Sequence, residues 1–163
     1  MQQGKDYDAG AAESGSTGVV ETIASQPMLE PSSEARTAPA RLLLVDDTPA
    51  NLKILARLLE KRGYQTELAV DGFQAIDRYR TGDYDAVLMD LQMPGLDGFD
   101  ATKAIRAMAD RRQVPIIALT AHVVDGTRER CLKVGMSDYL AKPIDVALLT
   151  ETIEAQLRAG GSR

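Results

Sequence analysis

The feature that most constrains the fold of this chain is an alternation of short apolar runs with stretches of helical spacing. The five runs are residues 41–45, 64–69, 85–89, 114–120 and 137–141. The first, third and fourth are almost continuously apolar, which is typical of strands that are covered on both faces. The second run alternates, with Gln65 and Glu67 predicted to face away from the core, and this pattern favours an edge strand.

Between and after these runs, apolar residues recur every three or four positions, as on the buried side of a helix. The residues expected on these stripes are Leu52, Leu55, Leu58, Leu59, Phe73, Ile76, Tyr79, Phe99, Thr102, Ile105, Met108, Val146, Leu149, Ile153 and Leu157. Strands alternating with helices predict a parallel sheet with right-handed crossovers and helices on both faces. The length of each unit indicates a flavodoxin-like, doubly wound five-stranded α/β fold, with strand order 2-1-3-4-5.

The composition divides the chain into three parts. Residues 1–40 are rich in Ala, Ser, Gly, Thr and Pro. Such a segment cannot bury enough apolar area to offset the entropy lost on ordering it. We therefore predict a disordered tail or linker over residues 1–40, a folded domain over 41–158 and a flexible C-terminus over 159–163.

Charge and composition exclude several classes of function. The net charge is −5 and the pI about 4.9, which argues against a surface that binds nucleic acid. A single cysteine, Cys131, rules out an intrachain disulfide and a Cys-rich metal site, and the single His122 leaves little for zinc. No apolar run is long enough to cross a bilayer, and no signal peptide is evident at the start. We expect a cytoplasmic protein without membrane partners.

Polar residues stand where the predicted strands end. Asp46 and Asp47 follow the first strand, Asp90 follows the third, Thr120 ends the fourth and Lys142 follows the fifth. Each alone has an ordinary explanation as a helix N-cap, a turn residue or a solvated loop residue. In an open α/β sheet, however, ligands bind at the carboxyl ends of the strands, where all of these residues would meet.

Clustered carboxylates call for a cation. Two unit charges ~4 Å apart repel by roughly 1 kcal/mol in water and ~4 kcal/mol at the effective dielectric near a protein surface. Hard oxygen ligands suit Mg²⁺. A carboxylate beside Mg²⁺, an ammonium and a hydroxyl forms a site suited to phosphoryl transfer, with a carboxylate able to act as the nucleophile.

Four segments resemble one known family: "LLLVDD", "DAVLMDLQMPGLDGFDATKAIR", "PIIALTAH" and "GMSDYLAKPI". They resemble the receiver domain of two-component response regulators, and most of all the receivers of hybrid sensor kinases and phosphorelays. The resemblance covers roughly residues 41–157. It implies phosphorylation of Asp90 by a histidine kinase or a histidine phosphotransfer protein.

The resemblance also implies a magnesium site. Asp46 and Asp47 would be the acidic pair that organises Mg²⁺, and Asp47 and Asp90 would be direct ligands. The backbone carbonyl of Gln92 would be a further ligand. The side chains of Gln92 and His122 would lie where they can tune hydrolysis of the phosphoryl group.

The remaining implied roles concern the switch and its output. Thr120 would hydrogen-bond the phosphoryl group, Lys142 would pair with it, and Tyr139 would be the switch aromatic. The chain would catalyse only its own phosphorylation and dephosphorylation. It would act on a downstream protein through a surface around its fourth helix, fifth strand and fifth helix. We also predict a cis peptide bond between Lys142 and Pro143, in the turn that aims Lys142 at Asp90.

Three rival functions fit the sequence less well. A phosphatase of the haloacid dehalogenase type needs a second Asp two residues after the nucleophile, but Gln92 follows Asp90 and Thr48 follows Asp46. A flavodoxin-like cofactor binder would have a phosphate loop rich in Ser, Thr and Gly after the first strand. A transcription factor would have a DNA-binding domain, and only "RAGGSR" follows Leu157.

Overall fold

The computed structural model describes residues 38–108, 110 and 113–160. The predicted tail, apart from residues 38–40, and the final residues 161–163 lie outside this part of the chain. The compact unit begins at Pro39. Ala40 already belongs to it, because this residue is buried and its carbonyl accepts a hydrogen bond from the Gln65 N–H at 2.9 Å.

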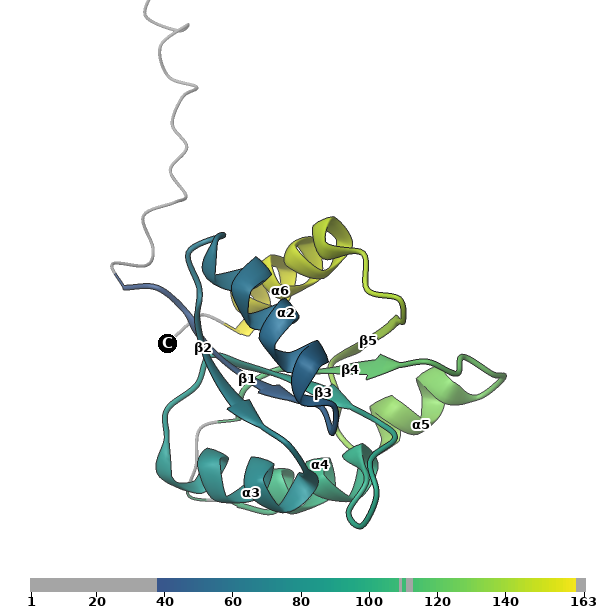
Figure 1. Cartoon of the computed structure of the whole chain (residues 1–163). Helices are drawn as coiled ribbons and strands as arrows, with labels where there is room; N and C mark the ends of the chain where they lie inside the picture. Colours follow the sequence, from purple (N-terminus) through teal and green to yellow (C-terminus); the bar gives the residue numbers. More distant parts are fainter. Residues whose placement is uncertain (1–37, 109, 111–112, 161–163) are drawn as a thin grey trace, which may run out of the picture. The chain divides into compact units, whose positions relative to one another are not determined.

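The sheet has the predicted topology, with five parallel strands in the order β2-β1-β3-β4-β5 (Figure 1). The strands are β1 (Arg41–Val45), β2 (Gln65–Ala69), β3 (Ala86–Asp90), β4 (Ile116–Thr120) and β5 (Asp138–Ala141). Val45 pairs with Met89, and Thr120 pairs with Ala141. This register brings the carboxyl ends of β1, β3, β4 and β5 to one rim of the sheet.

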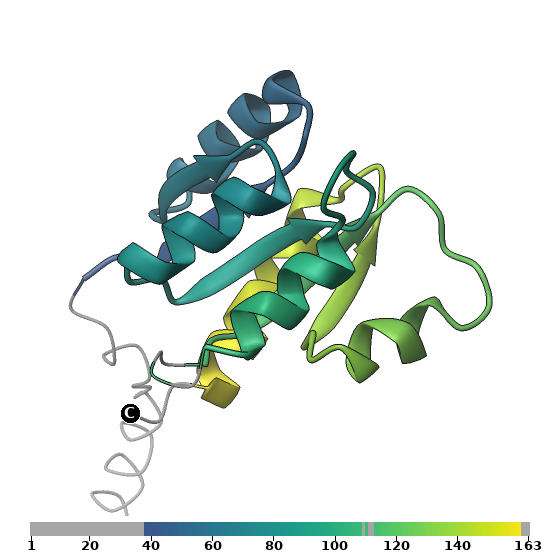
Figure 2. The same cartoon turned by 90° about the horizontal axis from the view of Figure 1, so that it is seen from below.

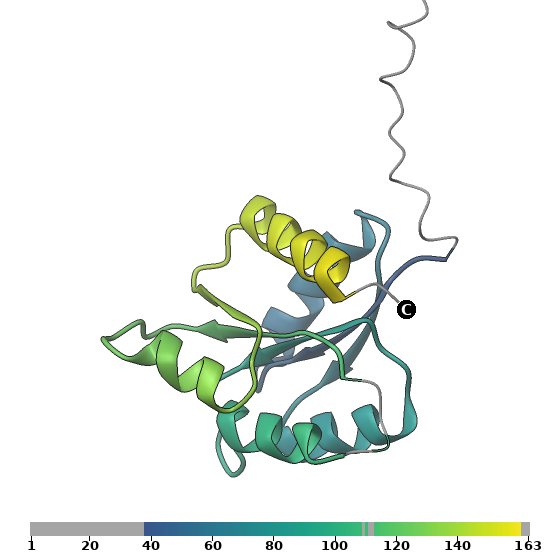
Figure 3. The same cartoon turned by 180° about the vertical axis from the view of Figure 1, so that it is seen from behind.

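Helices cover both faces of the sheet. They are α2 (Pro49–Glu60), α3 (Gly72–Thr81), α4 (Gly98–Arg106), α5 (Thr127–Lys133) and α6 (Val146–Gly160). Figures 1 and 3 show α2 and α6 on one face, and Figure 2 shows α3 and α4 side by side on the other. The buried Cys131 of α5 shares a core cluster with residues of α3 and α4.

The two faces explain why the central strands are almost continuously apolar. Successive side chains of a strand point to opposite faces. Leu43 and Val45 of β1 pack in the cluster under α3, α4 and α5, whereas Leu42 and Leu44 pack in the cluster under α2 and α6. All four side chains are buried because neither face of β1 meets solvent.

The helical stripes are largely as predicted, with one error on α3. Tyr79 is 2% exposed, but Phe73, predicted on the same stripe, is 61% exposed. The buried line of α3 instead runs through Gly72, Ala75 and Tyr79. Gly72 fits there because a Cβ at this position would lie 2.7 Å from the Leu96 carbonyl oxygen, so α3 approaches the neighbouring loop too closely for a side chain.

The edge strand β2 also differs from its prediction at Glu67, which does not simply face away. Its carboxylate accepts hydrogen bonds from the Tyr84 hydroxyl at 2.7 Å, from Arg78 at 3.0 Å and from Arg41 at 3.3 Å. Side chains from three neighbouring segments therefore reach over this strand. The Tyr84 hydrogen bond is the main cause that holds the pKa of Glu67 below its ordinary value.

The two aromatic residues of α3 provide a matched test of this packing. Tyr79→Ala should lower the free energy of unfolding by about 3 kcal/mol or more, because it empties a buried site. Phe73→Ala should change it by less than about 1 kcal/mol, because the ring is mostly in solvent. Urea unfolding followed by circular dichroism measures both, and equal losses would contradict the assignment of the buried line.

Candidate functional site

The residues predicted from the strand ends gather at one rim of the sheet. Asp90 is the last residue of β3 and Thr120 the last of β4, and both are buried together with Asp46. Asp47 is exposed and Lys142 is partly buried. The rim therefore has a buried floor and one acidic side chain open to solvent.

Three carboxylates form the centre of this rim. Oxygen atoms of Asp46, Asp47 and Asp90 all lie within 4.8 Å of one another. The Thr48 N–H donates to Asp46 at 2.8 Å, and the Gln92 N–H donates to Asp90 at 3.2 Å. These backbone hydrogen bonds fix the direction of the two buried carboxylates. Neither Asp46 nor Asp47 is the N-cap of α2, because Thr48 holds that position.

Lys142 provides the balancing charge. Its Nζ lies 3.0 Å from Asp46 Oδ2 and 3.5 Å from Asp90 Oδ2. Burial lowers the pKa of Lys142, but the hydrogen bond to Asp46 and the charge of Asp90 outweigh it, and the net pKa is raised. The Lys142–Pro143 peptide bond is cis, as predicted.

One ammonium does not neutralise three carboxylates. Burial raises the pKa of Asp90, Lys142 lowers it, and the charges of Asp46 and Asp47 raise it further, so that the net pKa lies above the ordinary value. The donors are hard oxygens, Asp47 leaves one side open to water, and the Gln92 carbonyl accepts no hydrogen bond within the described residues. This donor set fits Mg²⁺, which binds through one or two carboxylates and retains several waters.

Thr120 and Tyr139 lie outside the carboxylate cluster. The Thr120 hydroxyl accepts from the His122 N–H and donates to the His122 carbonyl, both at 3.0 Å. In this structure it therefore bonds its own loop and not Asp90. Tyr139 is partly buried against the core cluster beneath α3, α4 and α5.

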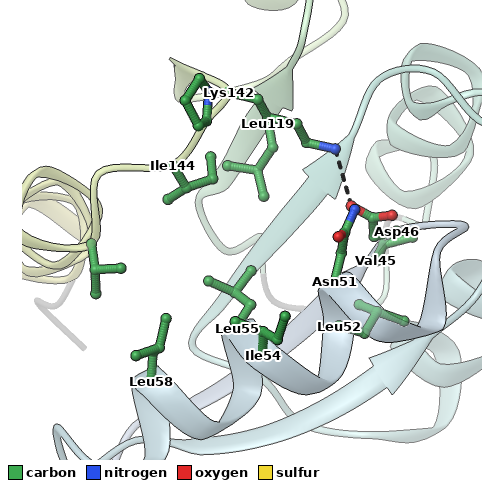
Figure 4. A pocket seen from close by; sticks show the side chains of 12 residues that line it. Val45, Asp46, Asn51, Leu52, Ile54, Leu55, Leu58, Leu119, Lys142 and Ile144 are labelled. Atoms are coloured by element: carbon green, nitrogen blue, oxygen red, sulfur yellow. Dashed lines mark hydrogen bonds and ion pairs between the residues drawn. The ribbon is translucent and has the colours of Figure 1, made fainter.

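Sequence reasoning missed a cavity that opens beside the site. It has a volume of about 360 Å³, and Asp46 and Lys142 lie at one end (Figure 4). Its apolar walls come from α2 and from Pro143, Ile144 and Val146. Asn51 and Ile54 line it, although neither lies on the predicted apolar stripe. Ile54 is 60% exposed, so the available signal was an apolar residue on the polar side of this helix.

A second missed feature joins two loops at the rim. His122 Nδ1 lies 2.9 Å from Gln92 Oε1. The sequence suggested that each side chain could approach a phosphoryl group on Asp90, but it carried no sign that the two meet.

Comparison with known proteins identifies similar chains. The family model for the response regulator receiver domain matches residues 42–154. The histidine-protein kinase BarA of Shigella flexneri is 43% identical over 120 residues, which are 74% of this chain and 13% of that protein. The sensor protein GacS of Pseudomonas syringae is 45% identical over 116 residues, 69% of this chain and again 13% of the relative. The chain thus spans only about an eighth of the length of these relatives.

Solved structures agree with these sequence matches. The receiver domain of a sensor histidine kinase from Pseudomonas aeruginosa is 45% identical, with a TM-score of 0.68 over 74% of this chain and 99% of that one. That structure has a magnesium ion coordinated in its active-site cleft. The chemotaxis protein CheY4 of Vibrio cholerae is 28% identical, with a TM-score of 0.69 over 73% of this chain and 99% of that one. No helix among the described residues is long and apolar enough to span a membrane.

The burial of Asp90 and the surplus of negative charge around it predict that this carboxylate can be removed with a gain in stability. The raised pKa of Asp90 means that the folded protein holds this proton more tightly than the unfolded chain does. The ionised Asp90 therefore lowers the free energy of unfolding. This loss is absent below the ordinary carboxyl pKa and grows as the pH rises through the folded-state pKa. In EDTA, Asp90→Asn should therefore raise the free energy of unfolding at neutral pH and leave it nearly unchanged at low pH.

Urea unfolding at a series of pH values measures this difference. Asp125→Asn, which removes an exposed carboxylate outside the cluster, is the control and should not stabilise the protein at neutral pH. A loss of stability in Asp90→Asn at neutral pH would contradict the raised pKa of Asp90.

Proposed function

The chain belongs to the response regulator receiver family, and we propose that Asp90 is the residue on which it accepts a phosphoryl group. One observation carries the proposal. Asp90 ends the central strand β3, buried, with carboxylate oxygens of Asp46 and Asp47 within 4.8 Å and Lys142 Nζ at 3.5 Å. No other aspartate among the described residues combines a strand end with such neighbours.

The reaction follows from these contacts. An Asp90 carboxylate oxygen attacks the phosphorus of a phosphohistidine, an O–P bond forms, and the N–P bond to the imidazole breaks. The released imidazole nitrogen takes a proton from water. Lys142, beside Asp90 Oδ2, stabilises the charge on the phosphoryl oxygens, and the Gln92 N–H holds Asp90 Oδ1 in place.

Asp46, Asp47, Asp90 and the Gln92 carbonyl are the residues that would hold Mg²⁺. When bound, the ion supplies positive charge against the carboxylates and the phosphoryl oxygens. The acidic cluster of this chain and the magnesium ion in the similar receiver from Pseudomonas aeruginosa support this assignment.

The chain catalyses only its own phosphorylation and dephosphorylation in this proposal. The haloacid dehalogenase alternative is not supported, because Leu91 and Gln92 follow Asp90 where that chemistry needs an acid, and because the comparisons match receivers.

The proposed partners are proteins. A histidine kinase or a histidine phosphotransfer protein donates the phosphoryl group, as suggested by the similarity to the kinases BarA and GacS. A downstream protein reads the state of the surface around α5, β5 and α6. The net charge of −5 favours neither nucleic acid nor an anionic membrane as a partner, and we propose a cytoplasmic location.

The switch is proposed to act through Thr120 and Tyr139. A phosphoryl oxygen offers the Thr120 hydroxyl an acceptor, which draws the loop at residues 121–126 toward Asp90 and allows Tyr139 to turn inward. A hydrogen bond to a charged group contributes about 1.5–3 kcal/mol, a tenfold to hundredfold shift. A change in the ratio of switched to resting molecules from 1:99 to 99:1 needs ~5.5 kcal/mol, so partner binding must supply the remainder.

Phosphorylation of Asp90 can be tested directly. Incubation with acetyl phosphate and Mg²⁺ should add one phosphoryl group, acid-stable and base-labile, as measured by mass spectrometry. Asp90→Asn, Asp47→Asn and EDTA should each abolish it. Asp97→Asn, which removes a helix-capping aspartate outside the cluster, should retain it. Phosphate on Asp46 or Asp47 in the Asp90→Asn variant would refute the assignment.

Propagation to Tyr139 has its own test, by NMR with beryllofluoride as the phosphoryl mimic. Shift changes should reach Tyr139 and β5 in the wild type and be lost in Thr120→Ala. Thr81→Ala removes a hydroxyl at the far end of α3 and should leave them intact. Changes confined to the neighbours of Asp90 in every variant would show that the output surface lies elsewhere.

A further inference from the structure

A side-chain hydrogen bond joins the two loops that flank the acceptor site. Gln92 follows β3 and His122 follows β4, 30 residues apart, and His122 Nδ1 lies 2.9 Å from Gln92 Oε1. An amide oxygen accepts, so the contact is a hydrogen bond in the form of the imidazole that carries a hydrogen on Nδ1. Both residues are exposed, so this hydrogen bond lies at the surface of the protein.

The backbones of the same two residues form hydrogen bonds with Asp90 and Thr120, the two residues that the switch would bring together. The Gln92 N–H donates to Asp90 Oδ1 at 3.2 Å. The His122 N–H donates to the Thr120 hydroxyl, which donates in turn to the His122 carbonyl, both at 3.0 Å. A continuous path of hydrogen bonds therefore runs from Asp90 through Gln92 and His122 to Thr120.

These hydrogen bonds engage the Thr120 hydroxyl, which the switch would use to bind the phosphoryl group. A threonine hydroxyl has one hydrogen to donate. The Thr120 hydroxyl cannot donate it to a phosphoryl oxygen on Asp90 without releasing the His122 carbonyl. Whatever holds His122 in place therefore also holds Thr120 in its resting position.

Little else holds that part of the loop. Residues 121–126 are all exposed. Within the described residues, His122 makes every hydrogen bond of residues 121–123, and the next contact of the loop is between Val124 and Thr127. The Gln92–His122 contact is thus the link between this stretch and the β3–α4 turn that carries Gln92.

We propose that Gln92 and His122 form a strap that positions Thr120 and thereby sets the balance between its resting and switched positions. The inference rests on the proposed function for its consequence, since Thr120 must move toward a phosphorylated Asp90. A net hydrogen bond of ordinary strength corresponds to a shift of about two- to tenfold in that balance. By linkage, the affinity for a phosphoryl mimic changes by the same factor in the opposite sense.

The first test needs no phosphoryl group. Exchange of the His122 amide hydrogen, which is bonded to the Thr120 hydroxyl, is measured by NMR in the full chain with EDTA. Gln92→Leu removes the acceptor at similar size, and protection of this amide should fall about two- to tenfold. Gln92→Glu keeps an acceptor oxygen and should restore protection. Val124→Ala alters an exposed side chain in the same loop and should leave it unchanged.

The second test measures switching in the same variants, together with a variant of the histidine. Titration with beryllofluoride in Mg²⁺ should show a two- to tenfold higher affinity in Gln92→Leu than in wild type. His122→Leu should give the same gain, and the double variant should add little to either single one, because both lack the same bond. His122→Asn retains a side-chain donor and should lie nearer to wild type.

The outcomes separate the strap from the proposed function. Unchanged protection of the His122 amide in Gln92→Leu overturns the strap, as does an unchanged beryllofluoride affinity, or additive effects of the two Leu substitutions. If no variant and not even the wild type binds beryllofluoride, the proposed function fails instead. In that case, exchange of the His122 amide hydrogen in Gln92→Leu alone decides whether the strap positions Thr120.

Discussion

The structure depends on holding three carboxylates and one ammonium together at a single rim. Oxygens of Asp46, Asp47 and Asp90 lie within 4.8 Å of one another, and among the described residues only the Lys142 ammonium forms ion pairs with this cluster. Left to local forces, these side chains would separate, since like charges repel and each carboxylate is better solvated alone. The backbone prevents this, because each residue ends a strand of the same sheet or lies within two residues of a strand end. Burial raises the pKa of Asp90, and the nearby charges of Asp46 and Asp47 add to that effect.

Two apolar clusters supply the rigidity that the rim needs. Leu42 and Leu44 pack under α2 and α6, and Leu43 and Val45 pack under α3, α4 and α5. A strand fixed on both faces cannot shift its register without exposing side chains on each side. The position of Asp46 is therefore set by the burial of the four residues before it. The same reasoning applies to Asp90, which follows four buried residues of β3.

The loops at the rim are held differently, by few and exposed hydrogen bonds. Residues 121–126 contribute nothing to the buried core and are positioned by contacts of Thr120, His122 and Thr127. Such contacts can exchange partners at small cost, whereas the buried sheet cannot rearrange. Fixed charges on a rigid sheet beside a loop with few contacts are the arrangement that the proposed phosphorylation switch requires. The similarity to receivers of hybrid kinases is consistent with this division of roles.

The sequence by itself determined the fold class, the strand order and the residues of the rim. Continuous apolar runs predict strands that are buried on both faces. The parallel topology then places Asp46, Asp90, Thr120 and Lys142 at one edge of the sheet. Only the tertiary structure decided what depends on distances between segments far apart in the chain. Phe73 was misjudged because the close approach of α3 to Leu96 shifts its buried line, and Glu67 because three segments reach over β2. The cavity beside Lys142 lies between α2 and the segment after β5, and the bond between Gln92 and His122 joins two loops. Local periodicity does not predict contacts between such separate segments.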